Sequence, residues 1–243
     1  MKIIIPMAGG GSRFAKLGYD KPKPLIPVSL FNDIPMIEAV VNNMQFNDCE
    51  HIFIVQAEHC EKYGLDYFLK SIRPNSKIVK TNGLTEGAAC TVLLAKEHID
   101  NDESILIVNS DQHVEWDKKE FMEKIGQGND GCIFAFKSSL PNCSYVKLNE
   151  QGFVVEAVEK KVISDDATVG IYHWAKGSDF VKYANQMIAK NIRTNNEFYT
   201  CPVYQEAIND GKKITTFDVI KYWSLGTPDE LNNFVANYKH ENV

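Results

Sequence analysis

No stretch of the 243-residue chain is apolar over enough residues to cross a membrane. The first apolar run, from Ile3 to Gly9, is only seven residues long. That is too short for a signal-peptide core followed by a cleavage site. These absences argue against a membrane-spanning or secreted protein, and we expect a cytoplasmic protein without a membrane partner.

The sequence also lacks the usual cysteine frameworks. Six cysteines occur, but none form a CxxC pair, and no cysteine–histidine set has the spacing of zinc ligands. Several lie in apolar stretches, such as Cys132 in the segment GCIFAF. We interpret these thiols as small buried hydrophobic residues in a reducing compartment.

Basic charge is scarce. The chain has 26 Lys and Arg residues against 32 Asp and Glu residues, which gives a formal net charge of −6. Proteins that coat nucleic acid depend on clustered Lys and Arg, so we expect no nucleic-acid partner. A site for a small anionic ligand needs only a few local cations and stays open. The sequence leaves a homodimer open without deciding the oligomeric state.

The first half contains apolar strand patterns that alternate with helical patterns. Met36–Met44 places apolar residues on one helical face after Pro35, and Tyr63–Ile72 and Gly87–His98 also have helical patterns. The strands are short continuous apolar runs, which is typical of strands buried on both faces. Such alternation predicts an α/β fold, with a parallel sheet covered by helices on both faces. The predicted strands are Lys2–Met7, His51–Gln56, Lys77–Thr81, Ser104–Asn109 and Gly131–Lys137.

The pattern changes after residue 140. Three β-segments follow one another, with a turn at Asn149–Gly152, and helical patterns come after them. No repeat, low-complexity tract or linker separates the two parts, so we predict one domain with halves 1–140 and 141–243. The predicted strands are Ser144–Leu148, Phe153–Glu159 and Ala167–Trp174, and the predicted helices are Ser178–Ala189, Tyr199–Ile208 and Pro228–Lys239.

A glycine-rich segment, Ala8–Phe14, follows the first predicted strand directly. Three consecutive glycines, Gly9, Gly10 and Gly11, let backbone N–H groups approach a phosphate, and Ser12 and Arg13 come next. The spacing is neither that of a P-loop nor that of a GxGxxG dinucleotide fingerprint. Taken alone, the glycines fit a simple turn equally well.

Lys23 lies between Pro22 and Pro24, ten residues after Arg13. The two prolines stiffen the backbone, so the lysine is held as a positioned point charge. The glycines, the arginine and this lysine together favour a polyphosphate site over an exposed turn.

The whole run, from Gly9 to Arg13 and from Pro22 to Val28, resembles the signature of the sugar-phosphate nucleotidyltransferases, usually written GxGxR and PKP. The resemblance implies a Rossmann-like, three-layer α/β/α fold of the GT-A type with a mixed, mainly parallel sheet. It also implies that an NTP and a phosphorylated sugar or sugar-like molecule form NDP-X and pyrophosphate, for surface polysaccharide synthesis. Arg13 and Lys23 would then be catalytic contacts to the phosphates. The nucleotide-binding residues would be Ala8, Gly9, Gly10, Gly11 and Ser12, in the half 1–140.

Asp111 follows the buried strand Ser104–Asn109. An aspartate at the carboxyl end of a strand, beside a phosphate loop, is a natural Mg²⁺ ligand, although a turn aspartate is the alternative. By the resemblance, Asp111 is the metal-binding and catalytic aspartate, with Mg²⁺ as the cofactor. His113 could reach the metal or the second substrate, but an ordinary loop histidine is the stronger interpretation.

The segment Leu84–Ala89 has small residues before a helical pattern, which would let a planar base lie against the backbone. The resemblance makes Glu86 and Gly87 candidates for base contacts. For Glu86, a favourable charge at a helix N-terminus is a close alternative.

The second half resembles the acceptor-binding landmarks of the same family. Glu159 and Lys160, followed by Gly170, would bind acceptor hydroxyls and the acceptor phosphate. Ser144 and Asn196 are further candidates. Lys161 replaces the family's usual proline. Without the resemblance, a charged strand end and a helix cap explain these residues as well.

Ser224 is a departure from the family pattern, because an aspartate usually lies two residues before the glycine of this closing motif, here Gly226. A serine hydroxyl is a neutral, weaker metal ligand. The metal would therefore depend on Asp111, phosphates and water, or on another group.

Two other function classes stay open. One is a GT-A glycosyltransferase that uses Asp111 and its neighbours as a metal-binding motif and consumes a nucleotide sugar. The other is a non-catalytic regulator that binds nucleotide, which Ser224 would allow. The Arg13 and Lys23 pair favours the nucleotidyltransferase, since two cations suit a triphosphate.

Overall fold

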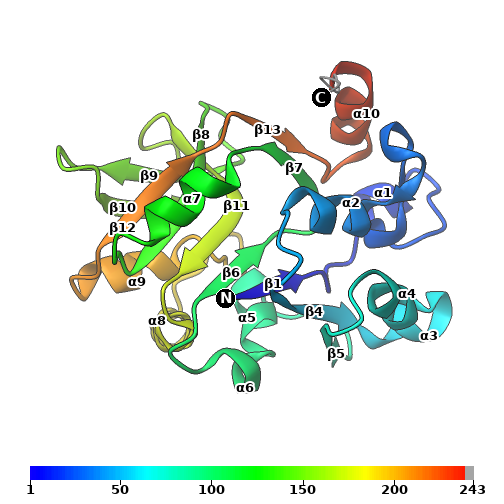
Figure 1. Ribbon diagram of the computed structural model, residues 1–243, viewed down its shortest axis with the longest axis horizontal. Coiled ribbons are helices and arrows are strands. Elements are labelled where there is room, and N and C mark those ends of the chain that lie inside the picture. The colour runs from blue at the N-terminus through cyan, green and yellow to red at the C-terminus, as the bar shows by residue number, and fades with distance from the viewer. Residues whose placement is uncertain (239–243) are drawn as a thin grey trace.

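The computed structural model describes residues 1–238. Helices cover both faces of a nine-stranded sheet, which gives three layers (Figure 1). The order along the sheet is β10-β9-β11-β6-β1-β4-β5, and β8 extends it by pairing with both β11 and β12. These strands are β1 (Lys2–Pro6), β4 (Glu50–Gln56), β5 (Lys77–Thr81), β6 (Ile105–Val108), β8 (Gly131–Lys137), β9 (Ser144–Leu148), β10 (Val154–Glu159), β11 (Asp166–Trp174) and β12 (Ile214–Asp218).

The sheet is mixed but mainly parallel. β1 pairs in parallel with β4 and β6, and β4 pairs in parallel with β5. β11 is antiparallel to β6, β8 and β9, and β10 is antiparallel to β9. Only β10 and β11 of the nine strands therefore run against the others. The parallel sheet predicted from strand patterns needs this correction, and the mixed sheet implied by the family resemblance is confirmed.

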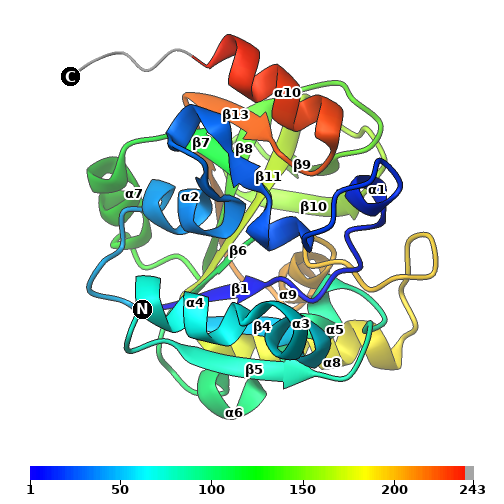
Figure 2. The ribbon, with the colours of Figure 1, turned by 90° about the vertical axis from the view of Figure 1, so that its right-hand side faces the viewer.

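Alternate residues of each central strand face opposite helix layers. Ile4 of β1 belongs to a buried cluster with residues of α5, α8 and α9, whereas Ile3 and Ile5 belong to a second cluster with residues of α2, α3, α4 and α7. All three side chains are fully buried, as expected for strands covered on both faces. Figure 2 shows β1, β4 and β5 between the two layers. The helices are α1 (Ser12–Ala15), α2 (Met36–Asn43), α3 (Ala57–Tyr63), α4 (Leu65–Ile72), α5 (Ala88–Leu93), α6 (Lys96–Ile99), α7 (Lys118–Ile125), α8 (Gly177–Ala189), α9 (Val203–Asn209) and α10 (Pro228–Asn237).

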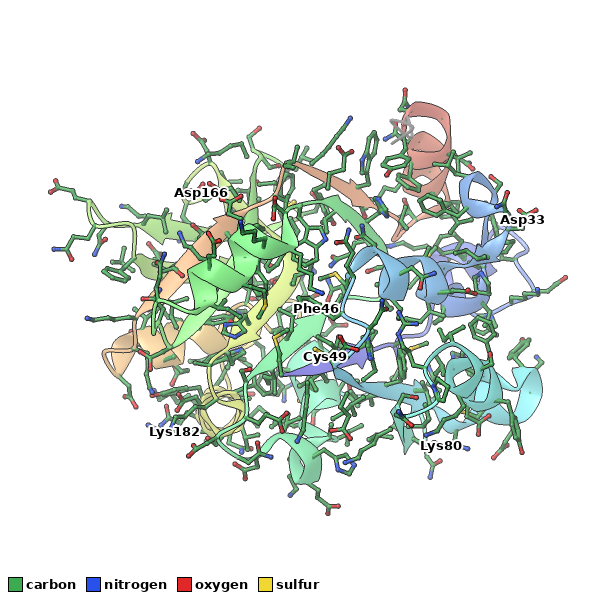
Figure 3. All side chains as sticks on the ribbon, viewed as in Figure 1. Asp33, Phe46, Cys49, Lys80, Asp166 and Lys182 are labelled. Carbon is green, nitrogen blue, oxygen red and sulfur yellow. The ribbon has the colours of Figure 1, made fainter. Side chains whose placement is uncertain are left out.

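Aromatic side chains fill the layer that contains α7. Phe46, labelled in Figure 3, has its ring 5.6 Å from that of Trp116 and 6.3 Å from that of Phe121. Phe121 is the fully buried side chain of α7, and its ring lies 5.6 Å from that of Phe217 of β12. These contacts fix α7 onto the sheet at β12.

A third apolar cluster lies beside the sheet and joins the two ends of the chain. Phe14 of α1 and Met36 of α2 belong to it together with Leu231 and Phe234 of α10. Figure 1 shows α10 on the same side of the molecule as α1 and α2. Two short antiparallel pairs support this region: β2 (Pro27–Val28) with β3 (Ile34–Pro35), and β7 (Gln112–Glu115) with β13 (Lys221–Ser224).

Several predicted helices differ from the observed ones. The helix predicted over 63–72 is interrupted at Gly64, whose φ of 65° is left-handed and ends α3. The pattern over 87–98 forms two short helices, α5 and α6, and α9 begins at Val203 rather than at Tyr199. The last predicted helix ends at Asn237 in the structure, and Lys239 lies outside the described residues.

The segments β7, α7, β12 and β13 were not predicted. Within residues 1–238, no helix is long and apolar enough to span a membrane.

Candidate active site

The glycine-rich loop leaves the carboxyl end of β1 and turns at Gly11, whose φ is 59°. This left-handed conformation suits glycine and precedes the short helix α1, which carries Arg13. The amide of Gln56, at the end of β4, donates to the backbone oxygens of Ala8 (2.8 Å) and Gly9 (3.3 Å). Gln56 is 8% exposed, so the loop is held by a buried partner that sequence reasoning missed.

Lys23 meets Asp111 across the site. The Lys23 Nζ donates to the Asp111 Oδ2 over 2.7 Å, and both side chains are about one-quarter exposed. The prolines act as predicted from their chemistry: Pro22 is extended, and Pro24 is buried in the 3₁₀ turn Lys23–Leu25. Asp111 follows the fully buried strand β6, and its backbone oxygen accepts from the Leu225 N–H at 2.8 Å.

Two cavities adjoin at this ion pair. The first has a volume of about 520 Å³ and the second about 480 Å³. Ala88, Asn109 and Asp111 line both. Among the predicted site residues, the second cavity is lined by Ala8, Gly9, Gly10, Ser12, Lys23, Gly87 and Asp111. The first cavity is lined by Arg13, Asp111, Ser144, Glu159, Lys160 and Gly170.

The first cavity contains a partly buried carboxylate. The Ser144 hydroxyl donates to the Glu159 Oε2 across the β9–β10 pair. Burial raises the pKa of Glu159, and the hydrogen bond from Ser144 opposes that rise. A carboxylate in this setting gains from hydroxyl donors, which a sugar would supply.

Lys160 and Tyr199 also line the first cavity. Lys160 has a left-handed φ of 53°, and its Nζ donates to the Tyr199 hydroxyl while lying 4.3 Å from the centre of that ring. Lys161, which replaces the family's usual proline, therefore comes directly after a residue in a left-handed backbone conformation. Lys160 and Arg13 are cations that line this cavity.

Gly170 and Asn109 lie in close contact at the floor of the first cavity. Gly170 has a φ of 82°, and a Cβ placed there would come within 2.1 Å of the Asn109 Nδ2. The Asn109 N–H donates to the Gly170 oxygen at 3.0 Å. Asn109 lines both cavities, and it was not among the predicted site residues.

Glu86 and Asn196 are not brought into either cavity. The Glu86 carboxylate forms an ion pair with Arg193 at 2.5 Å, and its side chain is 67% exposed. Asn196 is exposed, with a φ of 64°, and its backbone oxygen accepts from Arg193. Their assigned contacts to base and acceptor stay predictions.

Gly11 does not line the cavities but underlies Lys23, since a Cβ at Gly11 would lie 3.4 Å from the Lys23 Cβ. His113 is 7% exposed within β7, and its ring packs 4.9 Å from that of Tyr238. The interpretation of His113 as an ordinary loop histidine is therefore wrong about its location, because the residue is buried in a strand that pairs with β13.

The ligands that the protein offers to a metal ion are few. Residues 1–238 contain no group of three or more His, Cys, Asp and Glu side chains placed to hold an ion. Mg²⁺ is usually bound through one or two carboxylates, with substrate phosphates and water completing its shell. Asp111 beside the glycine-rich loop fits that mode of binding. The described residues do not form a site in which protein atoms alone would surround the ion.

The sequence of this chain is similar to those of known proteins. Residues 2–241 match the family model for nucleotidyl transferases. The "Bifunctional protein GlmU" of Methanococcus vannielii is 33% identical over 181 residues, which are 71% of this chain and 40% of that protein. The protein of the same name from Methanocaldococcus jannaschii is 29% identical over 123 residues, 51% of this chain and 28% of that one. The chain thus spans two fifths or less of these curated relatives.

Solved structures have the same fold. A nucleoside-diphosphate-sugar pyrophosphorylase from Vibrio cholerae RC9 has a TM-score of 0.83 and 26% identity, covering 97% of this chain and all of that one. A UDP-glucose pyrophosphorylase complexed with UDP-glucose has a TM-score of 0.77 and 18% identity, covering 98% and 97% of the two chains. Since the family model matches almost the whole sequence, the chain belongs to the nucleotidyl transferase family.

Proposed function

We propose that this protein is an enzyme that transfers a nucleoside monophosphate from an NTP to a phosphorylated sugar or sugar-like small molecule, releasing pyrophosphate. The observation that carries the proposal is the 2.7 Å ion pair between Lys23 and Asp111 at the junction of two cavities. The likeness to the Vibrio cholerae nucleoside-diphosphate-sugar pyrophosphorylase, at 26% identity over nearly the whole chain, supports it.

The two cavities suit the two substrates. The second cavity carries the glycine-rich loop and residues 84–88, so we place the NTP there. The first cavity carries Ser144, Glu159 and Lys160, so we place the phosphorylated acceptor there. This assigns nucleotide binding mainly to the half 1–140 and acceptor binding mainly to the half 141–243.

An oxygen of the acceptor phosphate would attack the α-phosphorus of the NTP. A new phosphorus–oxygen bond forms as the bond from the α-phosphorus to the bridging oxygen breaks, and pyrophosphate leaves with that electron pair. A phosphate ester is already anionic near neutral pH, because its second pKa is about 6. No general base is needed, and Arg13 and Lys23 would position the phosphates and balance their charge.

Mg²⁺ is part of this proposal, with Asp111 as a ligand. When bound, the ion would neutralise charge on the phosphates. The Lys23 ammonium contacts the Asp111 carboxylate in this structure, and a bound triphosphate would offer that ammonium other anionic partners. A role for the product in surface polysaccharide synthesis stays a prediction.

The test is a matrix of NTPs against phosphorylated acceptors, measured as pyrophosphate release. Arg13→Ala, Lys23→Ala and Asp111→Ala should each lower kcat by about 10²–10³, the usual loss for a preorganised contact. Lys21→Ala is the matched control, because Lys21 is exposed two residues from Lys23. Circular dichroism would check that each variant is folded.

Three results would contradict the proposal. Full activity in all three variants would remove the site assignment. Consumption of a nucleotide sugar without pyrophosphate release would indicate a glycosyltransferase. Binding of NTP without turnover of any phosphorylated acceptor would indicate a regulator.

A further inference from the structure

Three side-chain oxygens converge on the space beside Gly226. A Cβ at this glycine would lie 3.0 Å from the Asp111 Oδ2, 3.4 Å from the Glu230 Oε2 and 3.6 Å from the Ser224 Oγ. The two carboxylate oxygens are therefore no more than 6.4 Å apart, the sum of the first two distances. Gly226 leaves open a small space rimmed by oxygen atoms, at the edge of the first cavity.

The fold brings Glu230 to this place from the end of the chain. Strand β13 pairs with β7, and the Leu225 N–H is fixed to the Asp111 oxygen. The chain then enters α10, where the Thr227 hydroxyl accepts from the Glu230 N–H at 3.2 Å. In a full capping box the glutamate side chain would return to the Thr227 N–H. Within residues 1–238 no such bond forms, and the Glu230 carboxylate lies next to Gly226 instead.

A cationic group already contacts one of these oxygens. The Asp111 Oδ2 that faces the space at Gly226 is also the oxygen that accepts from the Lys23 Nζ at 2.7 Å. This oxygen therefore lies between the Lys23 ammonium and the space beside Gly226, and its negative charge favours a cation in that space. The Glu230 carboxylate adjoins the same space.

The chemistry of these oxygens suits a hard divalent cation. Carboxylate and hydroxyl oxygens are the donors that Mg²⁺ and Mn²⁺ prefer. Ser224 can offer only a neutral oxygen, so Asp111 alone would leave the ion with one anionic protein ligand. The assignment of a second ligand rests on the proposed function, in which phosphates of the NTP would complete the coordination shell of the cation.

We infer that Glu230, in the first turn of α10, supplies the second carboxylate for the divalent cation at Asp111, in place of a carboxylate at position 224. The C-terminal helix is then part of the metal site. Since α10 also packs on Phe14 and Met36, its position links the metal to the segment that carries Arg13 and Lys23.

The test measures metal binding rather than turnover. Mn²⁺ binding to the full chain would be followed by electron paramagnetic resonance, alone and with each α,β-methylene NTP analogue. Glu230→Gln should raise the Kd for Mn²⁺ at least about tenfold, as loss of a metal-site group commonly does. Asp229→Asn is the matched control, because it removes the same charge from the same helical turn at an exposed position, and its Kd should stay within about twofold.

A rescue variant completes the design. Ser224→Asp in the Glu230→Gln background places a carboxylate next to the same space and should restore most of the Mn²⁺ affinity. The inference is overturned if Glu230→Gln binds Mn²⁺ as the wild type does, if Asp229→Asn weakens binding equally, or if the wild type binds no Mn²⁺. If Mn²⁺ binding depends on Glu230 but no pyrophosphate is released, the proposed function fails and this inference stands.

Discussion

At the scale of single residues, Gly170 combines backbone strain with a close contact. Its φ of 82° is unfavourable for other residues, and a Cβ would meet the Asn109 amide at 2.1 Å. Gly152 has a similar φ of 80° with no atom within 4 Å of its Cβ position. Substituting Gly170 and Gly152 in turn therefore separates the free-energy cost of the backbone conformation from that of the contact with Asn109.

We therefore expect Gly170→Ala to lower the free energy of unfolding more than Gly152→Ala does. The conformational cost alone should be about 1 kcal/mol in both variants, and displacement of Asn109 should add about 1–3 kcal/mol at Gly170. Urea denaturation measures both values. Equal losses would show that Asn109 moves aside freely and does not depend on Gly170 for its position.

The residues that bear charge were predictable from sequence because their neighbours restrict them. The prolines around Lys23 and the glycines before Arg13 are visible without a structure. Gln56 and Asn109 were not predictable, since an isolated glutamine or asparagine at a strand end has no local signature. Only the pairing of β1 with β4 and β6 brings them to the glycine-rich loop.

At the scale of elements, the segment around Phe198 is hydrogen-bonded to the start of α5, and we call these contacts the Phe198 clamp. The Phe198 N–H donates to the Glu86 oxygen at 2.8 Å, and the Ala89 N–H donates to the Phe198 oxygen at 3.0 Å. Gly87 permits this approach, because a Cβ there would lie 2.4 Å from the Phe198 oxygen. Arg193 adds the ion pair with Glu86 and lies 3.9 Å from the centre of the Phe198 ring.

Weakening the Phe198 clamp should affect NTP binding in the second cavity more than the free energy of unfolding. We expect Arg193→Ala to raise the KM for NTP severalfold while lowering the free energy of unfolding by about 1 kcal/mol or less, since the ion pair is exposed. Glu86→Gln keeps the stacking on Phe198 and should have a smaller effect. If Glu86→Gln instead changes which NTP is preferred, Glu86 contacts the base as the sequence predicted.

Strands could be predicted from the sequence where the apolar run was continuous, as in Ile3–Ile5. The prediction failed for β12 and β13, whose residues are polar in part and whose partners are distant in sequence. β12 pairs with β8 and β13 with β7, so their conformation depends on contacts that no local pattern contains.

At the scale of the whole molecule, buried histidines link stability to pH. His51 and His173 are 2% and 3% exposed, and burial lowers the pKa of each to about 4 from the ordinary 6.5. The folded state therefore binds fewer protons than the unfolded state between these values. Stability is fully present above pH 6.5 and is lost as the pH falls toward 4.

We expect His173→Phe to reduce this pH dependence by removing one of the two groups. The contribution of one histidine is at most about 3 kcal/mol over this interval. The phenyl ring can keep a contact with Phe121, whose ring lies 5.9 Å from that of His173. Denaturation midpoints from pH 7 to pH 4 would measure the slope, and an unchanged slope would contradict the assignment.

The sequence by itself determined the α/β class and the order of most strands, because continuous apolar runs and helical spacing are local properties. It also indicated a polyphosphate site, and the resemblance of the glycine-rich loop, Arg13 and the proline-flanked Lys23 to a known signature indicated the nucleotidyltransferase family. Only the tertiary structure brought Lys23 to Asp111, Gln56 to the loop and Glu230 to the space beside Asp111. Those contacts join residues 47 to 119 positions apart in the chain, and only the order of strands in the sheet and the docking of α10 specify such distances.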